Sequence, residues 1–338
     1  MFMSSVLSAL LLGLFPVAAD IPLPLPPLAS LVGVPIAPPA ERVSIDRRLS
    51  ASGIIVVDLA SGQSVYGMQA DIERPMASLT KLMTALLIVE KHDLEEWVTI
   101  PKDIAETPGS VAYLPADEQF TVGDLLSALL IASANDAAVT LARFHSGSLE
   151  TFVKEMNARA LSLGLTGTQY ANASGMDDPR QWSTPRDIAR LVSFIQNESA
   201  IRERMSLKGT VIRSRSGQTV PLTHTHALLR ANNPLVEEGK TGTTNAAGQC
   251  LVSVVGKDGH EYVVVLLKSQ KRYDDMQAIL LSLFGSIGAT ETPVQDTECA
   301  QGGGHARQSL SSAEASAKAD GDGGCPASGT RDRSQATQ

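Results

Sequence analysis

The stretch MASLTKLMTALLIVE, residues 76–90, determines how the rest of the chain is interpreted. Its apolar residues recur with the period of an α-helix, so it predicts a helix from Ser78 to about Lys91 that packs one face against a core. The positions that carry this period are Leu82, Ala85, Leu86 and Val89.

A serine and a lysine stand three residues apart at the start of this helix, on one face and about one turn apart. The Lys81 amine can therefore reach the Ser78 hydroxyl. Unpaired N–H groups and the positive end of the helix dipole favour a developing oxyanion there. Because an apolar site disfavours the ammonium form, such a lysine can act as a base. Ser-x-x-Lys also arises by chance about once in a chain of this length, so an ordinary helix start is the alternative.

The composition is that of a soluble globular protein with one large domain or two small ones. The formal charge of −8 is spread along 338 residues without a run of Lys or Arg. We therefore expect no nucleic-acid partner and no binding to an anionic membrane surface.

The two ends differ from the middle of the chain. Residues 1–19 combine an apolar run with small residues before Asp20, which indicates a cleavable secretory signal and a periplasmic protein, although the segment carries no Lys or Arg. A proline-rich linker is expected over 20–45, a catalytic domain over 46–290 and a disordered low-complexity tail over 291–338.

The three cysteines do not form a disulfide framework. Cys250 lies in an apolar, strand-like run and is expected to be a buried thiol. Cys299 and Cys325 both lie in the tail and could pair.

The order of predicted elements is strands, a helical block, more strands and a last helix. This order indicates an α+β fold whose sheet takes strands from both ends of the chain. The signals are a hairpin at 53–67, a capping box at Thr121 and Asp124, a helix from Asp136 to Phe144, a Thr184-Pro helix start running to Ile195, strands from Gly209 onward and a helix from Asp274 to Phe284.

Two further motifs carry chemistry. Ser133-Ala-Asn135 lies at a break between two helices and offers a hydroxyl for proton relay and an amide, although each residue could be a simple cap. Lys240-Thr-Gly242 enters a strand and offers an ammonium, a hydroxyl and a bare backbone beside which a peptide can lie. A solvated lysine on a strand edge is its alternative. All three motifs in this order are characteristic of penicillin-interacting serine enzymes.

Several longer segments resemble the low-molecular-mass penicillin-binding proteins, the serine D-alanyl-D-alanine carboxypeptidase/endopeptidase family. The resemblance covers roughly residues 50–285 and implies a three-layer α/β/α fold, with a five-stranded antiparallel sheet, flanking helices and an all-helical subdomain. The segments are ASLTKLMTALLIVE, SANDAAVTLARF, NARALSLGLTGTQYANASGMDD, STPRDIARL and GKTGTTNAAGQCLV.

The resemblance implies catalytic roles for four residues. Ser78 would be acylated, Lys81 would be its general base, Ser133 would relay the proton and Asn135 would orient the substrate.

It also implies a substrate-binding strand. Lys240 and Thr241 would hold the substrate carboxylate, Gly242 would let the peptide approach, and the Thr243 N–H would join that of Ser78 in an oxyanion hole.

The expected activity is removal of D-alanine from peptidoglycan stem peptides, with β-lactams as inhibitors and no cofactor or metal. The phrase TNAAGQCLV and the short length favour a second possibility, an endopeptidase that cleaves D-alanyl-diaminopimelate cross-links. The polar tail lacks the amphipathic anchor of many relatives, so no stable membrane attachment is expected.

Four rival interpretations are weaker. A class A β-lactamase needs Glu-x-x-Leu-Asn and an α/β-hydrolase needs Gly-x-Ser-x-Gly, and neither occurs in the sequence. His224 and His226 could suggest a metal, but without a third ligand they are predicted to be exposed strand residues. A non-catalytic wall-binding protein would lack Ser78 or Lys81.

Overall fold

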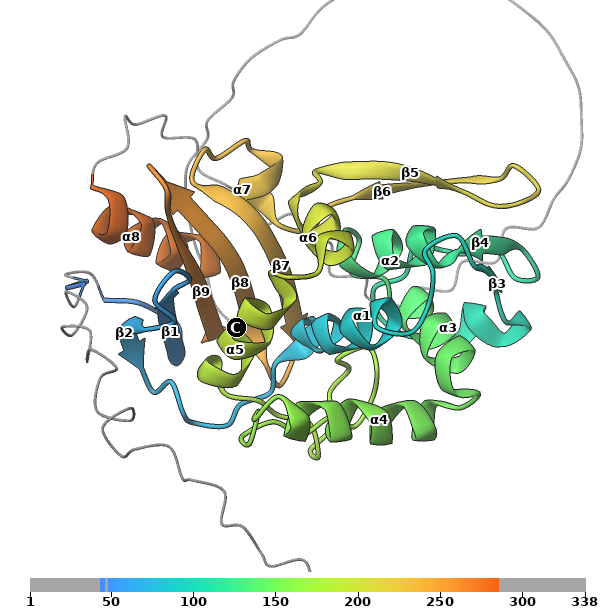
Figure 1. Cartoon of the computed structure of the whole chain (residues 1–338), viewed down its shortest axis with the longest axis horizontal. Coiled ribbons are helices and arrows are strands. Elements are labelled where there is room, and N and C mark those ends of the chain that lie inside the picture. Colours follow the sequence, from blue (N-terminus) through green and yellow to red (C-terminus); the bar gives the residue numbers. More distant parts are fainter. Residues whose placement is uncertain (1–42, 46–47, 286–338) are drawn as a thin grey trace, which may run out of the picture. The chain divides into compact units, whose positions relative to one another are not determined.

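The computed structural model describes residues 43–45 and 48–285 (Figure 1). The predicted signal segment, nearly all of the linker and the tail lie outside these residues, as do Cys299 and Cys325. Predictions about those segments therefore stay predictions.

A five-stranded antiparallel sheet forms the centre of the described chain, in the order β2-β1-β9-β8-β7. As predicted, the sheet takes strands from both ends of the chain, and the structure shows two from the N-terminal part and three from the C-terminal part. The strands are β1 (Gly53–Asp58), β2 (Ser64–Met68), β7 (Val236–Thr244), β8 (Gly248–Lys257) and β9 (His260–Ser269). The strand with the Lys-Thr-Gly motif, β7, lies at an edge of the sheet.

Helices cover both faces of this sheet, which confirms the three-layer prediction. On β1, Ile54 and Val56 pack toward α7 (Ala227–Arg230) and α8 (Arg272–Phe284), whereas Ile55 and Val57 belong to the core on the other side. Because both faces are buried, β1 reads as a continuous apolar run instead of an alternating one.

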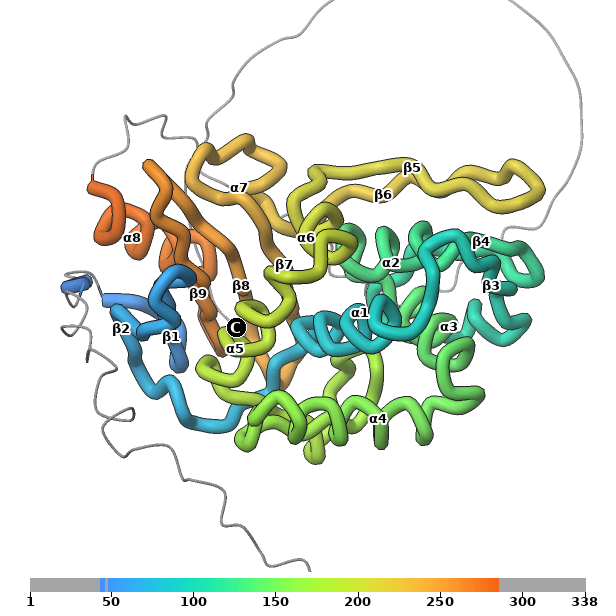
Figure 2. The backbone as a smooth tube through the Cα atoms, in the orientation of Figure 1, coloured from blue at the N-terminus to red at the C-terminus, as the bar shows by residue number. Residues whose placement is uncertain are grey.

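The helical block is inserted between β2 and β7, as the chain path in Figure 2 shows. Its helices are η2 (Ala77–Thr80), α1 (Lys81–Val89), η3 (Lys102–Glu106), α2 (Val122–Leu130), α3 (Asn135–Ser146), α4 (Leu149–Ser162), α5 (Pro185–Ile195) and α6 (Ser199–Ser206). The predicted all-helical subdomain also contains two-stranded ladders, formed by β3 (Trp97–Thr99) with β4 (Gln119–Thr121) and β5 (Gly209–Arg213) with β6 (Thr219–Thr223).

Two helix starts behave as their sequences predict. The Thr121 hydroxyl accepts a hydrogen bond from the Asp124 N–H at 3.1 Å, and the Thr184 hydroxyl accepts one from Asp187 N–H at 3.0 Å. Pro185 is the first residue of α5, where a missing N–H costs nothing.

The helix predicted from residue 78 to about 91 differs in two ways. It begins with the 3₁₀ turn η2 and continues as α1, which ends at Val89. Every residue of α1 from Lys81 to Ile88 is buried, so the helix lies inside the body of the protein and not against one face of it. The periodic stripe was therefore only part of its buried surface.

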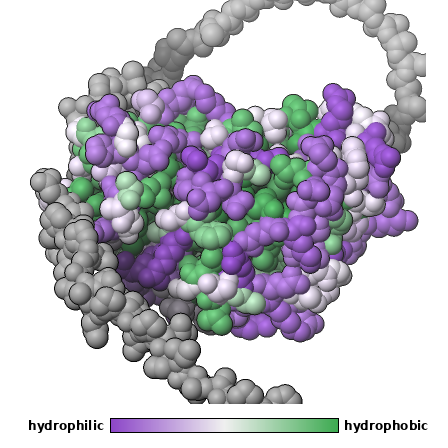
Figure 3. All heavy atoms as spheres, in the orientation of Figure 1, coloured by the Kyte–Doolittle hydropathy of each residue, from purple (hydrophilic) through white to green (hydrophobic). Residues whose placement is uncertain are grey.

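Polar side chains cover much of the face seen in Figure 3, with apolar patches between them. Within residues 43–45 and 48–285, no helix is long and apolar enough to cross a membrane.

Candidate active site

The 3₁₀ turn η2 holds Ser78 in a strained backbone. Ala77, just before it, has φ +50°, a left-handed conformation that costs a residue with a Cβ about 1 kcal/mol or more. Two glycines let other segments touch this turn. A Cβ on Gly175 would lie 2.1 Å from the Ala77 carbonyl oxygen, and one on Gly242 would lie 2.9 Å from the Ser78 nitrogen. Ser78 is therefore enclosed from two sides by backbone.

Lys81 is fully buried on the first turn of α1, with its Nζ 3.1 Å from the Ser78 Oγ. Nζ also donates hydrogen bonds to Asn135 Oδ1 at 2.6 Å and to the Ser174 carbonyl oxygen at 2.5 Å. Burial lowers the pKa of Lys81 well below its usual value, and the charge of Lys240 lowers it further.

These contacts leave the Lys81 amine ready to accept a proton. A neutral amine has two N–H donors and one lone pair, and the Asn135 Oδ1 and Ser174 carbonyl oxygens can only accept. If each takes one N–H, the lone pair faces Ser78 Oγ. This is the arrangement of a nucleophile and its general base.

The Ser133-Ala-Asn135 motif bridges α2 and α3, and the loop at 108–114 fixes its position. Asn135 donates from its backbone N–H to the Ser110 carbonyl oxygen at 2.7 Å, and from Nδ2 to the Pro108 carbonyl oxygen at 2.7 Å. The second bond turns Oδ1 toward Lys81. The Asp136 carboxylate accepts N–H groups of the same loop, and Ser133 has φ +57°.

Lys240 is the second fully buried lysine of the site. Its Nζ donates to Ser133 Oγ at 2.7 Å and to the Thr241 carbonyl oxygen at 2.8 Å. The Thr241 hydroxyl donates to Thr225 Oγ1 at 2.6 Å. The solvated-lysine alternative for this motif is therefore wrong.

The structure brings the three motifs into one site. Ser78, Lys81 and Asn135 form one bonded group, and Ser133 with Lys240 forms a second beside it. The side chains of Thr241 and Thr243 instead form hydrogen bonds with residues outside the three motifs. The exposed Thr243 accepts a hydrogen bond at Oγ1 from Arg272 Nη1 at 2.9 Å, and Thr241 contacts Thr225.

A sequence profile of the peptidase S11 family, described as D-alanyl-D-alanine carboxypeptidase, matches residues 40–271. The chain belongs to this family.

Curated relatives within the S11 family have two kinds of name. A D-alanyl-D-alanine endopeptidase of Escherichia coli K12 is 32% identical over 67% of this chain and 75% of its own length. The D-alanyl-D-alanine carboxypeptidase DacC of the same organism is 32% identical over 77% of this chain and 68% of its own length.

Solved structures of S11-like enzymes have the same fold. The Streptomyces K15 DD-transpeptidase superposes with a TM-score of 0.67 at 26% identity, covering 71% of this chain and 99% of that one. The D-alanyl-D-alanine carboxypeptidase of Mycobacterium tuberculosis H37Rv gives 0.67 at 27% identity, covering 74% and 96%.

Four residues of the site were not predicted: the Ser174 carbonyl, Asp136, Thr225 and Arg272. Arg272, the first residue of α8, donates from Nη1 to the Gly242 carbonyl oxygen at 3.2 Å and to Thr243, so it braces the S11 Lys-Thr-Gly strand. No local pattern marks these four contacts. Asp136 adjoins a motif, however, and Thr225 stands between the two histidines that were considered as metal ligands.

The prediction that His224 and His226 are exposed is wrong, because both are completely buried. His226 Nε2 lies 2.8 Å from Ser253 Oγ, and the His226 N–H donates to His224 Nδ1 at 2.9 Å. Gly239 leaves the space, since a Cβ there would lie 2.3 Å from the His226 ring. The two histidines were predicted to be strand residues, but they follow the end of β6 at Thr223, and the segment turns inward before α7.

Proposed function

We propose that this chain is a serine D-Ala-D-Ala carboxypeptidase that acts on peptidoglycan stem peptides through an acyl-enzyme on Ser78. The observation that carries the proposal is the 3.1 Å separation of Ser78 Oγ from the Nζ of buried Lys81, whose other two partners are both acceptors. Membership of the S11 family supports the same chemistry.

In the proposed reaction Ser78 Oγ attacks the carbonyl carbon of the penultimate D-alanine while its proton passes to Lys81 Nζ. The N–H groups of Ser78 and Thr243 stabilise the oxyanion. When the C–N bond breaks, Ser133 conducts a proton to the departing amine of the terminal D-alanine. Water then hydrolyses the ester, which releases the shortened peptide and restores Ser78.

The terminal carboxylate of the substrate is assigned to β7. Lys240 supplies a buried positive charge and Thr241 a hydroxyl, and both groups lie beside the bare backbone of Gly242. A peptide can pair with this edge strand by backbone hydrogen bonds. β-Lactams, which also carry a carboxylate beside a reactive carbonyl, are proposed to inhibit by the same acylation.

The location that fits this substrate is the periplasm, because peptidoglycan lies outside the cytoplasmic membrane. The apolar and small residues of the first 19 positions support export.

The test is labelling with a fluorescent penicillin, followed by incubation with a stem pentapeptide. Wild type is expected to label covalently and to release D-alanine. Ser78→Ala is expected to do neither, whereas the control Ser64→Ala, at an exposed position of β2, should behave like wild type. No label on wild type contradicts the proposal and favours a non-catalytic protein. Equal covalent label on Ser78→Ala contradicts the assignment of Ser78 and points to another nucleophile.

An endopeptidase is the second candidate, because an E. coli relative that shares 75% of its length with this chain carries that name. Incubation with cross-linked stem-peptide dimers separates the two activities. Cleavage of dimers faster than D-alanine release from pentapeptide would assign the chain to the endopeptidase branch.

A further inference from the structure

The loop 170–177 reaches the proposed nucleophile and its base with two consecutive residues. The Ser174 carbonyl oxygen accepts a hydrogen bond from Lys81 Nζ at 2.5 Å. Gly175, with φ +91°, packs so closely on the turn before Ser78 that a Cβ would lie 2.1 Å from the Ala77 carbonyl oxygen. The backbone conformation of this loop therefore determines one of the contacts of the Lys81 amine.

One side chain, that of Asn172, holds the loop in this conformation. Its Oδ1 accepts hydrogen bonds from three consecutive backbone N–H groups, those of Ser174 at 3.2 Å, Gly175 at 2.7 Å and Met176 at 3.2 Å. Its Nδ2 donates to the Met176 carbonyl oxygen at 3.0 Å. An asparagine that bonds the backbone two residues further on forms an Asx turn, in which the side chain takes the place of a backbone group.

A single peptide group connects Asn172 with Lys81. The Ser174 carbonyl and the Gly175 N–H belong to the same planar, trans peptide group, so they point in opposite directions. The N–H donates to Asn172 Oδ1 at 2.7 Å, and the carbonyl accepts from Lys81 Nζ at 2.5 Å. Any rotation of this peptide group weakens both bonds together. The Asn172 amide therefore fixes the direction in which the Ser174 carbonyl points.

The direction of this carbonyl matters because a neutral amine can turn about its C–N bond. With one N–H bonded to Asn135 Oδ1 and the other to the Ser174 carbonyl, the lone pair of Lys81 faces Ser78 Oγ. If the carbonyl points elsewhere, one bond alone does not prevent the amine from turning an N–H toward Ser78. An amine in that orientation cannot take the proton of the hydroxyl.

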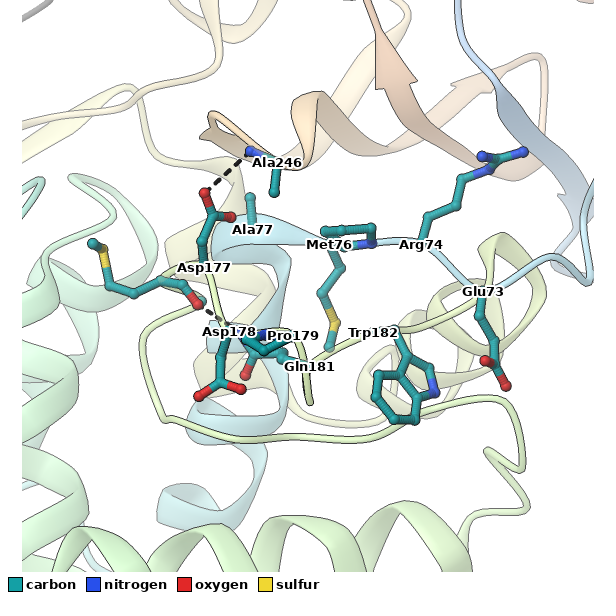
Figure 4. Close-up of a pocket in the computed structure, with 13 residues that line it drawn as sticks. Glu73, Arg74, Met76, Ala77, Asp177, Asp178, Pro179, Gln181, Trp182 and Ala246 are labelled. Carbon is teal, nitrogen blue, oxygen red and sulfur yellow. Dashed lines mark hydrogen bonds between the residues drawn. The ribbon is translucent and has the colours of Figure 1, made fainter.

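Other side chains anchor the two ends of the same loop. Asn157, on α4, accepts a hydrogen bond from the Tyr170 N–H at 2.8 Å and donates one to the Tyr170 carbonyl oxygen at 2.9 Å. At the opposite end, Asp177 Oδ2 accepts a hydrogen bond from the Ala246 N–H at 3.1 Å, which is drawn as a dashed line in Figure 4. These bonds hold the loop in place without involving the peptide group that faces Lys81.

We propose that Asn172 is a positioning residue for the general base: it holds the Ser174–Gly175 peptide group in the orientation that directs the lone pair of Lys81 at Ser78. Asn172 acts through this peptide group, and not by contact with the reacting atoms. The inference rests on the proposed function, because it assumes that Lys81 takes the proton of Ser78.

The experiment follows acylation by a fluorescent penicillin in a stopped-flow instrument, over a range of penicillin concentrations and at a pH where the rate no longer rises. This separates the maximal acylation rate constant from the dissociation constant of the non-covalent complex, and the final amount of label gives the fraction of active protein. In Asn172→Ala the maximal rate constant is expected to fall about 10- to 100-fold, because the base is misoriented. The dissociation constant and the labelled fraction are expected to stay near their wild-type values.

The matched control is Asn157→Ala, the same substitution at the residue that anchors the start of the loop. It is expected to lower the melting temperature and to keep the wild-type acylation rate constant, because the Asn172 turn stays intact. If either alanine variant does not fold, Asn172→Ser and Asn157→Ser provide the same comparison. A serine hydroxyl can form the same kind of turn as asparagine, although more weakly, so Asn172→Ser is expected to show a smaller loss of rate constant.

The outcomes separate this inference from the proposed function. An unchanged rate constant in the Asn172 variant, with or without a smaller labelled fraction, shows that Asn172 only stabilises the loop and overturns the inference. Equal losses of rate constant in the Asn172 and Asn157 variants overturn it as well. In each of these cases, labelling of wild type at Ser78 and release of D-alanine leave the carboxypeptidase proposal standing. Absence of both in wild type overturns both proposals.

Discussion

Lys81 and Lys240 are both fully buried in one site, and each lies within hydrogen-bonding distance of an active-site serine, yet their surroundings differ. Lys81 Nζ contacts an amide oxygen, a carbonyl oxygen and the nucleophile. Lys240 belongs to the edge strand β7, along which a substrate carboxylate is proposed to lie. Burial and the charge of Lys240 lower the pKa of Lys81. In the proposed mechanism the two buried lysines have different roles, because burial and the charge of Lys240 favour a neutral Lys81 that can act as a base.

The largest expected effect comes from removing the base. Lys81→Met keeps the apolar stem but loses the proton acceptor, so acylation by fluorescent penicillin is expected to slow by about 10²- to 10⁴-fold. The second-order acylation rate constant, measured by stopped-flow, reports this loss. Lys91→Met removes an exposed lysine beyond the end of α1 and serves as the control. If Lys81→Met folds with an unchanged melting temperature and still acylates at the wild-type rate, another group is the base.

A smaller and more selective loss is expected at the other lysine. Lys240→Met removes a charged partner of the substrate carboxylate, worth about 1.5–3 kcal/mol, so kcat/KM for a D-Ala-D-Ala peptide should fall about 10- to 100-fold. The C-terminal amide of the same peptide tests the cause. Wild type should already be slow on the amide, and the variant should lower its rate much less. An equal loss on acid and amide would place Lys240 in the chemistry and not in carboxylate binding.

The sequence was sufficient to predict that the three motifs form one site, because each motif lies where the sequence also indicates a helix start, a break between helices or a strand. Lys81 follows a serine by one helical turn, Ser133 and Asn135 occupy a break between helices, and Lys240 lies in the middle of the β7 strand. The central sheet was predictable because its strands are apolar runs bounded by turn residues.

The remaining contacts of the site depend on tertiary packing. The Ser174 carbonyl oxygen reaches Lys81 across 93 positions, and Arg272 reaches Gly242 from the far end of the domain. A backbone carbonyl carries no residue-type signal at all. The exposure of His226 was predicted wrongly, because its burial depends on Gly239 of β7, which leaves space for the ring.

The electrostatic link between the two lysines can be tested by pH. In the proposed mechanism acylation requires neutral Lys81, so its rate is expected to rise as pH increases through the pKa of that group. Replacing Lys240 with methionine removes a repelling charge and raises the Lys81 pKa. The rising limb of the pH profile of acylation should therefore move to higher pH in Lys240→Met, whatever its absolute rate. A limb that stays in place, or moves to lower pH, shows that the charge of Lys240 does not lower the pKa of Lys81.

The smallest expected effect concerns His224, a buried side chain whose pKa the charge of Lys240 also lowers. Burial, and then the charge of Lys240, lower the pKa of His224 to about 3. The unfolded chain binds a proton at this residue below about pH 6.5, whereas the folded chain does not until about pH 3. The free energy of unfolding therefore decreases as pH falls through this window, by roughly 1 kcal/mol at pH 5.5.

Urea unfolding at pH 7.5 and 5.5 measures this loss in wild type and in His224→Gln. Glutamine does not titrate, so the variant should lose roughly 1 kcal/mol less than wild type between the two pH values, even if it is less stable at both. The exposed His260, at the start of β9, supplies the control His260→Gln, which should keep the wild-type pH dependence. Equal pH dependence in wild type and His224→Gln means that the folded protein protonates His224 as readily as the unfolded chain does. In that case neither burial nor the charge of Lys240 lowers the pKa of His224.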